Sequence, residues 1–310
     1  MKKLDVAAYL REHDGYVIIT HRRPDGDTLG SAAALCRGLR QLGKTAYVLE
    51  NPEITPKYTH LLEGLTVAKE AEDAILIATD VASPGMLPEH APQRQIALRI
   101  DHHGSATPFA ELEWVEPETA ACGELIYELL MELGVTLDRE MGNALYTAVS
   151  TDTGCFRYPN TRSHSHLVAA ACRGASPDIF AINQALFDTT TLGRLRIQGW
   201  MVENAWFLQD GKVCICAIPL EVERKLGLCE DDMENISGFP RSIEGVKVAA
   251  TLRQQPDGLV KVSVRAVPGC DAAAICEKFG GGGHKGAAGA SINAPIQEAA
   301  KMMAEAIGEV

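Results

Sequence analysis

The chain has 310 residues, of which 46% are hydrophobic and 23% are charged, and its formal net charge at pH 7 is −12. This length favours two globular domains, because single hydrophobic cores stop growing at about 250–300 residues. The acidic balance argues against a broad basic groove for long duplex DNA. A nucleic-acid substrate should therefore be short, or be held by metal ions and a few local cations.

The sequence also argues against membrane insertion and secretion. It contains no apolar run close to the roughly 20 residues that a membrane span needs, and its first residues, MKKLDVAAYLREHDG, turn polar too soon for a secretory signal. The nine cysteines form no CxxC pair, which favours free thiols in a reducing compartment. We therefore expect a cytoplasmic protein with no membrane partner.

The first half of the chain alternates strand-like and helix-like segments, as parallel α/β folds do. The predicted strands are the apolar runs at 16–20, 45–50, 74–80 and 95–101. The predicted helices cover 28–43, 119–134 and 138–152, and they are followed by an irregular segment at 153–161 and further helices to about residue 206. Open α/β sheets bind ligands at the carboxyl ends of their strands, so polar residues at those ends are candidates for a site.

In the second half, the pattern changes to hairpins. The segments QDGK and QPDGL each place Asp-Gly between alternating apolar strands, which is a strong hairpin signal. A helix at 271–279, a glycine-rich loop at 280–289, a short strand and a closing helix at 296–309 are expected to follow.

These patterns predict an α/β protein with a parallel-sheet N-terminal domain and a smaller C-terminal α/β domain. We place the first domain at 1–188, a helical linker at 189–200 and the second domain at 201–310, with the active-site cleft between the domains.

The stretch HRRPDGDTLGS directly follows the first predicted strand and holds His21, Asp25 and Asp27 within seven positions. Imidazole mixed with carboxylate oxygens favours Mn²⁺, with Mg²⁺, Co²⁺ or Zn²⁺ as alternatives. The same aspartates would also serve as a turn and an N-cap for the next helix. The stretch alone does not separate these interpretations.

Three more motifs of this kind lie downstream. Asp80 ends the third predicted strand, Asp101, His102 and His103 end the fourth, and Asp152 ends an apolar helix in STDTG. A helix cap would account for Asp80 or Asp152 alone. Three ionisable groups in a row at the edge of a sheet have little structural purpose, so the DHH triplet favours a functional site.

Together these motifs resemble the DHH phosphoesterase superfamily. HRRPDGD followed by GS, then Asp80, DHH and STDTG, occur in the order and approximate spacing of the family. The resemblance covers the whole first domain and implies a hydrolase with two divalent metal ions, most often Mn²⁺. One ion would be held by His21, Asp25 and Asp80. The ligands of the other would be Asp27, Asp80, His102 and Asp152, so that Asp80 is the bridge.

The resemblance also assigns roles to the rest of the DHH triplet. His103 would face the substrate and stabilise or protonate the reacting phosphate, while Asp101 would orient a neighbouring histidine. Two ions about 3.5–4 Å apart can activate a shared water and hold the attacking and departing oxygens of a phosphoryl displacement.

The stretch FGGGGHKGAAG resembles the GGGH signature of the DHH-associated domain, which follows the catalytic domain in many of these enzymes. The resemblance implies that Gly281, Gly282, Gly283 and His284 bind the substrate, together with Arg265, which matches a phosphate-binding position. The structural alternatives are a tight turn for the glycines and a surface charge for the arginine.

Within the superfamily, the two-domain plan with GGGH resembles the nanoRNase/pAp phosphatase group. Its substrates are short single-stranded RNA or DNA and the mononucleotide 3′-phosphoadenosine 5′-phosphate (pAp). A linear or cyclic dinucleotide phosphodiesterase is the alternative enzyme, and a nucleotide-binding module is the alternative without catalysis. A homodimer, the native metal, the preferred substrate and the roles of Cys155 and Arg157 stay open at this point.

Overall fold

The computed structural model describes residues 2–104, 107–233 and 236–308. The chain divides into two units, Met1–Thr189 and Thr190–Val310. The segment 189–200, which we expected to be a helical linker, lies mostly in the first helix of the second unit. Among the described residues, no helix is both long and apolar enough to cross a membrane.

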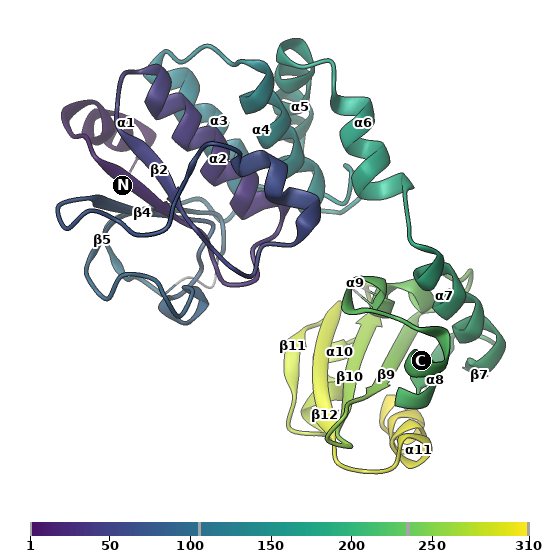
Figure 1. Cartoon of the computed structure of the whole chain (residues 1–310). Coiled ribbons are helices and arrows are strands. Elements are labelled where there is room, and N and C mark those ends of the chain that lie inside the picture. Colours follow the sequence, from purple (N-terminus) through teal and green to yellow (C-terminus); the bar gives the residue numbers. More distant parts are fainter. Residues whose placement is uncertain (1, 105–106, 234–235, 309–310) are drawn as a thin grey trace. The chain divides into compact units, whose positions relative to one another are not determined.

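The first unit contains a six-stranded sheet in which all neighbouring strands are parallel. Its strands are β1 (Tyr16–Ile19), β2 (Ala46–Leu49), β3 (Thr66–Val67), β4 (Ile75–Thr79), β5 (Ile96–Asp101) and β6 (Ala110–Val115). In space they follow the order β3-β2-β1-β4-β5-β6, so β1 and β4 are neighbours (Figure 1). The edge strands β3 and β6 were not predicted, because β3 has two residues and β6 is mostly half-buried without an apolar run.

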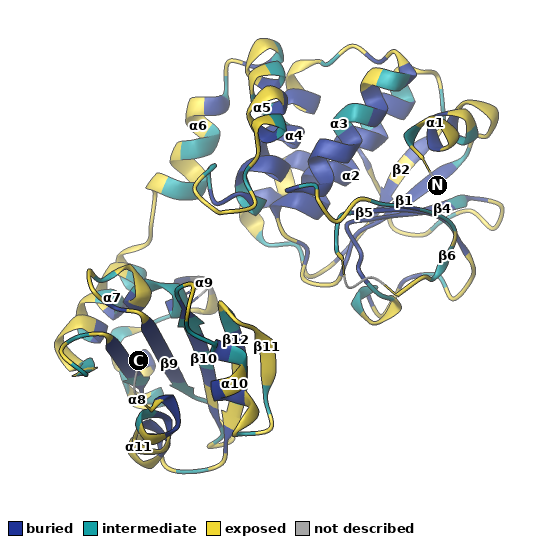
Figure 2. Ribbon diagram, turned by 180° about the vertical axis from the view of Figure 1, so that it is seen from behind, coloured by how far each residue is buried: buried dark blue, intermediate teal, exposed yellow. Residues whose placement is uncertain are grey.

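The helices of the first unit gather on one face of this sheet (Figure 2). They are α1 (Lys3–Glu12), α2 (Gly26–Gln41), α3 (Cys122–Leu133), α4 (Arg139–Asp152), α5 (Ser163–Ala175) and α6 (Ile179–Asn183). The helical turns η1 (Pro56–Leu62), η2 (Pro84–Met86) and η3 (Gln184–Asp188) connect other elements.

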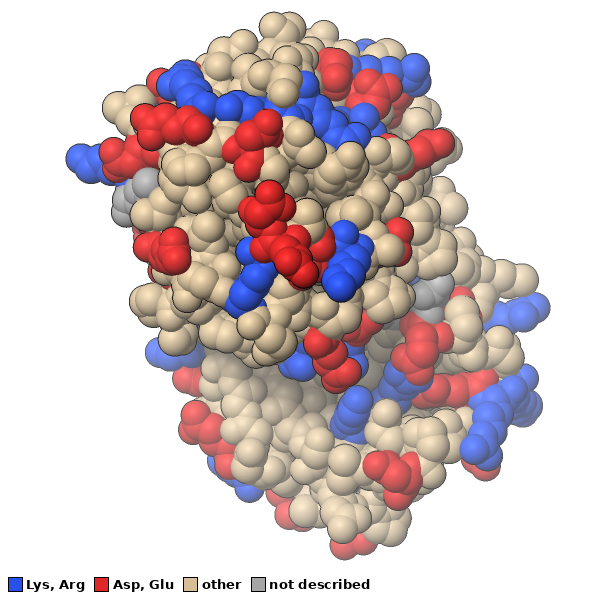
Figure 3. Space-filling view, turned by 60° about the vertical axis from the view of Figure 1, so that its left-hand side comes forward, with Lys and Arg blue, Asp and Glu red and all other residues tan. Residues whose placement is uncertain are grey.

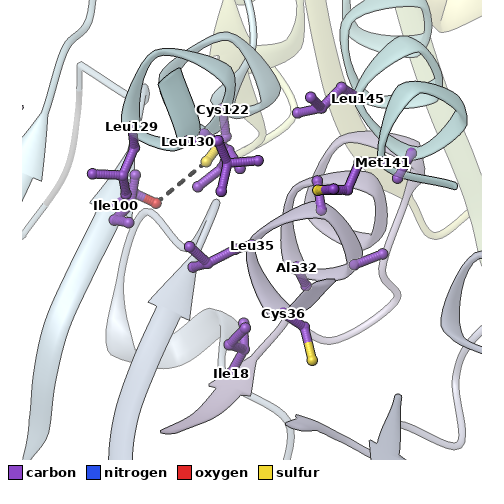
Figure 4. Packing of buried hydrophobic residues seen from close by; sticks show 14 of the residues in the cluster. Ile18, Ala32, Leu35, Cys36, Ile100, Cys122, Leu129, Leu130, Met141 and Leu145 are labelled. Carbon is purple, nitrogen blue, oxygen red and sulfur yellow. Dashed lines mark hydrogen bonds between the residues drawn. The ribbon is translucent and has the colours of Figure 1, made fainter. Parts of the chain in front are cut away.

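The core of the first unit lies on both faces of the sheet. Ile18 points to the helical face and shares one core with Leu35 of α2 and Leu129 of α3 (Figure 4). Val17 points to the other face, where segment 81–96 forms the cover. Every residue of β1 is buried because both faces are covered, which explains its uninterrupted apolar run.

Helices α2 and α4 approach each other closely at a glycine. A Cβ on Gly30 would lie 2.3 Å from the carbonyl oxygen of Ala144, so any larger residue would push the helices apart. Gly30 therefore serves the close packing of these helices. The contact fixes the start of α2 relative to α4, and these two elements carry aspartates of the candidate site.

The second unit contains a mixed six-stranded sheet in the order β11-β12-β10-β9-β8-β7, in which only β8 and β9 are parallel. Its strands are β7 (Trp206–Leu208), β8 (Val213–Ile218), β9 (Val248–Gln254), β10 (Val260–Ala266), β11 (Gly282–His284) and β12 (Ala287–Ile292). Its helices are α7 (Leu192–Asn204), α8 (Leu220–Leu226), α9 (Glu230–Met233), the turn η4 (Ile236–Ser242), α10 (Ala272–Glu277) and α11 (Ile296–Ile307). Both Asp-Gly segments join antiparallel strands, as predicted.

The glycine-rich segment is not the loop that we predicted over 280–289, because most of it forms the strand pair β11–β12. Its glycines allow the edge strand to lie against β12. A Cβ on Gly281 would lie 2.2 Å from the carbonyl oxygen of Gly289, and Gly283 adopts φ +146°, which side chains rarely tolerate. Part of the glycine run is therefore required by the fold itself.

Candidate functional site

The carboxyl ends of β1, β4 and β5 lie side by side and bring three of the four motifs together. Ile19 pairs with Ala78, and Thr79 pairs with Ile100, so the residues that follow these strands emerge at nearly the same level. His21 follows β1, Asp80 follows β4, and the DHH triplet begins at the last residue of β5. The start of α2 and the end of α4 add the remaining aspartates.

His21, Asp25 and Asp80 form the first cluster of ligand atoms. Nε2 of His21 lies 3.7 Å from Oδ1 of Asp25 and 3.8 Å from Oδ2 of Asp80. The other ring nitrogen, Nδ1, lies 2.7 Å from the carbonyl oxygen of Arg22. That carbonyl can only accept, so Nδ1 carries the proton and Nε2 faces the cluster as a ligand atom.

A second cluster surrounds His102. Its Nε2 lies 3.6 Å from Oδ2 of Asp27, 3.4 Å from Oδ1 of Asp80 and 3.5 Å from Oδ2 of Asp152. Its Nδ1 is held by the carbonyl oxygen of Thr119 at 3.1 Å, the same arrangement as for His21. The two oxygens of Asp80 therefore face different clusters, Oδ2 toward His21 and Oδ1 toward His102.

The position of Asp25 is compatible with both roles that the sequence left open. Its Oδ1 accepts hydrogen bonds from the backbone amides of Asp27 and Thr28, so it is the N-cap of α2. The same oxygen is the one that lies nearest to His21. A cap and a metal ligand are compatible here, because a carboxylate has enough lone pairs for both.

Asp27 is held by groups that sequence reasoning did not identify as part of a site. Its side chain is fully buried and accepts hydrogen bonds from the amides of Cys122 and Gly123, at 2.7 and 2.9 Å. These amides belong to the first turn of α3, where free N–H groups favour an anion. The hydroxyl of Ser31 donates to the same carboxylate at 3.1 Å. The only sequence signal was the small residues at the start of α3, which also suit packing.

Asp80 combines a strained backbone with an unpartnered buried oxygen. Its φ is +59°, a left-handed conformation that costs most residues about 1–2 kcal/mol. The side chain is 2% exposed, and Oδ1 has no hydrogen-bond donor among the described residues. A buried carboxylate oxygen without a donor is costly, so this atom fits a bound cation.

The DHH triplet is organised by its aspartate. Oδ1 of Asp101 accepts hydrogen bonds from the backbone amides of His102 and His103, and it lies 2.8 Å from Nδ1 of His103. Burial opposes ionisation of Asp101, but the bond to His103, with the charges of His103 and Arg99, holds the pKa of Asp101 below its usual range. Asp101 thus orients His103 and is not in either cluster. Nδ1 of His103 also lies 3.6 Å from Oδ1 of Asp80.

The charges of the site shift the pKa values in a consistent way. Burial and the charges of Asp80 and Asp152 raise the pKa of Asp27 well above its usual range. Burial, with the charges of Asp80 and Asp25, raises the pKa of Asp152 to about 7 against the opposing effect of His102. Burial alone would lower the pKa of His102, but the neighbouring carboxylates outweigh it and raise that pKa to about 10.

These shifts describe a surplus of negative charge, which bound protons or bound cations would relieve. The donor set, two imidazole nitrogens and several carboxylate oxygens, suits divalent ions such as Mn²⁺. Ligand atoms of His21, Asp25 and Asp80 lie within 4.8 Å of one another, and those of Asp27, His102 and Asp152 do as well. The residues present therefore fit metal ions.

Cys155 and Arg157 lie in an unusual turn directly after α4. Gly154, Cys155 and Phe156 all adopt positive φ, at 56°, 57° and 62°. The sulfur of Cys155 lies 3.8 Å from Oδ1 of Asn183, and Nε of Arg157 donates to the carbonyl oxygen of Gly154 at 2.7 Å. Both side chains thus have partners within the turn or beside it.

The residues expected to bind substrate lie in the second unit. Arg265, on β10, is half-buried, and its Nη1 donates to the carbonyl oxygen of Val264 at 3.1 Å. Gly282, Gly283 and His284 form the exposed edge strand β11, and Gly281 lies directly before it.

The two units match known protein families. Residues 16–149 match the DHH family N-terminal domain, and residues 210–309 match the DHHA1 domain. The chain is 32% identical to the bifunctional oligoribonuclease and PAP phosphatase NrnA of Thermus thermophilus, over 98% of this chain and 93% of that protein. It is 26% identical to NrnA of Bacillus subtilis, over 94% of this chain and 93% of that protein. An exopolyphosphatase-related protein from Bacteroides fragilis has the same fold, with a TM-score of 0.83 at 23% identity over 98% of this chain and 95% of that one.

We predict that the melting temperature (Tm) of the metal-free protein falls between about pH 6 and 9. A carboxyl with a raised pKa stabilises the fold while protonated and loses that contribution as the pH rises through about 7 for Asp152. Histidines with raised pKa lose theirs as the pH rises through about 8 for His21 and about 10 for His102. Both signs agree. Scanning calorimetry with and without Mn²⁺ measures the effect, and Mn²⁺ should raise Tm most at the alkaline end.

Asp152→Asn is the matched variant, because it removes one of the repelling carboxylates. It should raise the metal-free Tm at pH 8 and shrink the increase that Mn²⁺ produces. A metal-free Tm that climbs over this pH range would contradict the charge surplus.

Proposed function

The chain belongs to the DHH family, and from this premise we propose that it is a metal-dependent phosphoesterase that hydrolyses short oligonucleotides and pAp. The observation that supports this most directly is the meeting of six ligand residues from four separate motifs at one edge of a parallel sheet. They are His21, Asp25, Asp27, Asp80, His102 and Asp152. The relatives from Thermus thermophilus and Bacillus subtilis, which match over more than nine-tenths of both proteins, are named for the same two activities.

We assign two divalent ions to the site, most often Mn²⁺, with Mg²⁺ or Co²⁺ as alternatives. His21, Asp25 and Asp80 would hold one, and Asp27, Asp80, His102 and Asp152 the other. When bound, such a pair supplies the Lewis acidity that activates a water for attack on phosphorus. Asp80 suits the bridging position, because its oxygens face the two clusters separately.

The residues around the ions keep the site in one arrangement. Backbone carbonyls accept hydrogen bonds from Nδ1 of His21 and of His102. The proton of each ring therefore lies on Nδ1, and Nε2 is left to bind an ion. The amides of α3 hold Asp27. Asp101 accepts the hydrogen bond of Nδ1 of His103 and raises the pKa of this ring. In the protonated ring, Nε2 can donate to a phosphoryl oxygen or protonate the leaving group.

Arg265, Gly281, Gly282, Gly283 and His284 would hold the part of the substrate that is not cleaved. Arg265 offers a charged donor for a phosphate, and the exposed edge strand β11 offers backbone groups close to its surface. The first unit would then perform the cleavage, while these residues of the second unit select the substrate.

The charge of the chain agrees with a short substrate. On the face seen in Figure 3, basic side chains lie among acidic ones, and the net charge is −12. A short oligonucleotide or a mononucleotide needs only the ions and a few donors, while a long duplex needs many phosphate contacts. We also propose a cytoplasmic location, and the homodimer stays a prediction.

A linear or cyclic dinucleotide phosphodiesterase is the alternative enzyme, because it would use the same ions. A nucleotide-binding module without catalysis has no need for six converging ligands, so it accounts for less of the site.

The first test of this function is hydrolysis with Mn²⁺ of RNA and DNA from about two to ten nucleotides, pAp, cyclic dinucleotides and pyrophosphate. We expect hydrolysis of the shortest oligonucleotides and of pAp, with rates that fall as the chain lengthens. Asp80→Ala should abolish hydrolysis, because the loss of one shared carboxylate releases both ions.

Asp5→Ala is the control, because Asp5 lies on α1, outside every motif of the site. Its carboxylate accepts a hydrogen bond from the backbone amide of Lys2. It should leave turnover and metal content unchanged. Near-normal turnover of the Asp80 variant would remove the two-metal mechanism, and preferential hydrolysis of cyclic dinucleotides would favour the alternative enzyme.

His103→Ala should lower kcat by about 100-fold or more, the range for the loss of general-acid or electrostatic stabilisation. The metal stoichiometry, measured by elemental analysis, should stay nearly unchanged, because His103 acts on substrate. A variant that loses an ion would make His103 a ligand, which its distance to Asp80 permits.

Arg265→Ala and His284→Ala should each weaken the cleavage of dinucleotides and pAp by about 1.5–3 kcal/mol, the range for a charged hydrogen bond. Cleavage of bis-p-nitrophenyl phosphate, which lacks a distal phosphate, should change little. Lys301→Ala, on the exposed side of α11, is the control. Equal losses on both substrates would mean that these residues support the metal site instead.

A further inference from the structure

Arg99 is a buried arginine in the middle of β5, two residues before the DHH triplet. Arg99 is 1% exposed, and its guanidinium carbon lies over the ring of Phe109, 5.0 Å from the ring centroid. Across the sheet it stands in one row with Ala78 on β4 and Glu113 on β6. The small side chain of Ala78 suits this row, where a large neighbour would compete for space.

The guanidinium binds both connecting segments that leave the site-bearing strands. Nη1 donates to the carbonyl oxygen of Ala82 at 3.3 Å and to that of Thr107 at 3.1 Å. Ala82 lies two residues beyond Asp80, and Thr107 lies four residues beyond His103. The two segments are also joined directly, because the amide of Thr107 donates to Ala82.

Glu113 completes the arrangement from the neighbouring strand. Its Oε2 accepts from Nη2 of Arg99 at 3.1 Å, and its Oε1 accepts from the amides of Phe109 and Ala110 at 2.7 and 3.1 Å. The pair thus fastens the segment after the DHH triplet at Thr107, Phe109 and Ala110. The positive charge of Arg99 also lies on the same face of β5 as Asp101, the residue that orients His103.

A buried ion pair of this kind is a poor means of stabilising a core. The cost of desolvating both charges often cancels their attraction, and well-packed hydrophobic residues do as well or better. On the same face of the sheet, β1 and β4 carry the apolar residues Val17, Ile19, Leu76 and Ala78. Packing alone therefore does not explain why a charged residue occupies position 99.

We propose that Arg99 is a positioning residue that ties the segments after β4 and β5 together, so that Asp80, His102 and His103 keep the geometry that binds metal and substrate. This inference rests on the metal site of the proposed function. It adds a residue that lies outside every motif and touches neither ion nor substrate.

The test is Mn²⁺ binding by isothermal titration calorimetry to the metal-free full-length chain. Arg99→Met keeps the length of the side chain but loses its donors and charge. It should weaken Mn²⁺ binding roughly 10- to 100-fold, as changes in groups that orient metal ligands do. At saturating Mn²⁺, kcat on a dinucleotide should fall, while KM stays near the wild-type value. Arg99→Lys keeps the charge without the planar fork, and its Mn²⁺ affinity should lie between those of the wild type and Arg99→Met.

Leu98→Ala is the matched structural control, because Leu98 is a fully buried neighbour on the opposite face of the same strand. It should lower Tm as much as Arg99→Met or more, yet keep its Mn²⁺ affinity within about twofold. The proposal is overturned if Arg99→Met binds Mn²⁺ like the wild type, or if Leu98→Ala loses as much affinity. Should Arg99→Met not fold, an unchanged affinity of Arg99→Lys overturns it. A wild type that binds no Mn²⁺ would instead overturn the proposed function and this inference with it.

Discussion

Repulsion between buried carboxylates is the constraint on which the first unit depends. Asp27 and Asp80 are buried, and they converge at one edge of the sheet with Asp152, which is partly exposed. The raised pKa of Asp152 corresponds to a cost on the order of 4 kcal/mol for its ionised form near pH 8. Such a cost is a large share of the stability of a domain. A fold that keeps these groups together would gain from cations bound there, and His21 and His102 could supply nitrogen ligands.

Several independent contacts in the surrounding structure hold these carboxylates in place despite their repulsion. The free amides at the start of α3 bind Asp27, and the close contact at Gly30 holds α2 against α4. The backbone of Asp80 is held in a left-handed conformation after β4, and Arg99 fastens the segment that continues from it. Each support holds these side chains in place, so little of the binding energy of a metal ion would be needed to arrange them.

The fold requires part of the glycine-rich segment, and the rest is free for the proposed binding of substrate. Gly281 and Gly283 are required because β11 lies against β12 too closely for a side chain. Gly282 has open space around it, and His284 is exposed. The structural explanation therefore covers part of the run, and the exposed donors at this edge agree with the proposed binding of substrate.

The sequence by itself determined most strands and the candidate ligand types that the structure brings together, because apolar runs that end in Asp or His carry both signals at once. It also predicted the role of Asp101 in orienting a histidine, since the motif is local. It could not place Cys122 and Gly123 beside Asp27, or Arg99 beside Ala82 and Thr107, because backbone groups from other segments make these contacts. Nor did it predict the strand β11, because four glycines have no strand propensity and only pairing with β12 orders them. Tertiary structure decided these features, because each depends on which strand ends and helix ends become neighbours when the sheet forms.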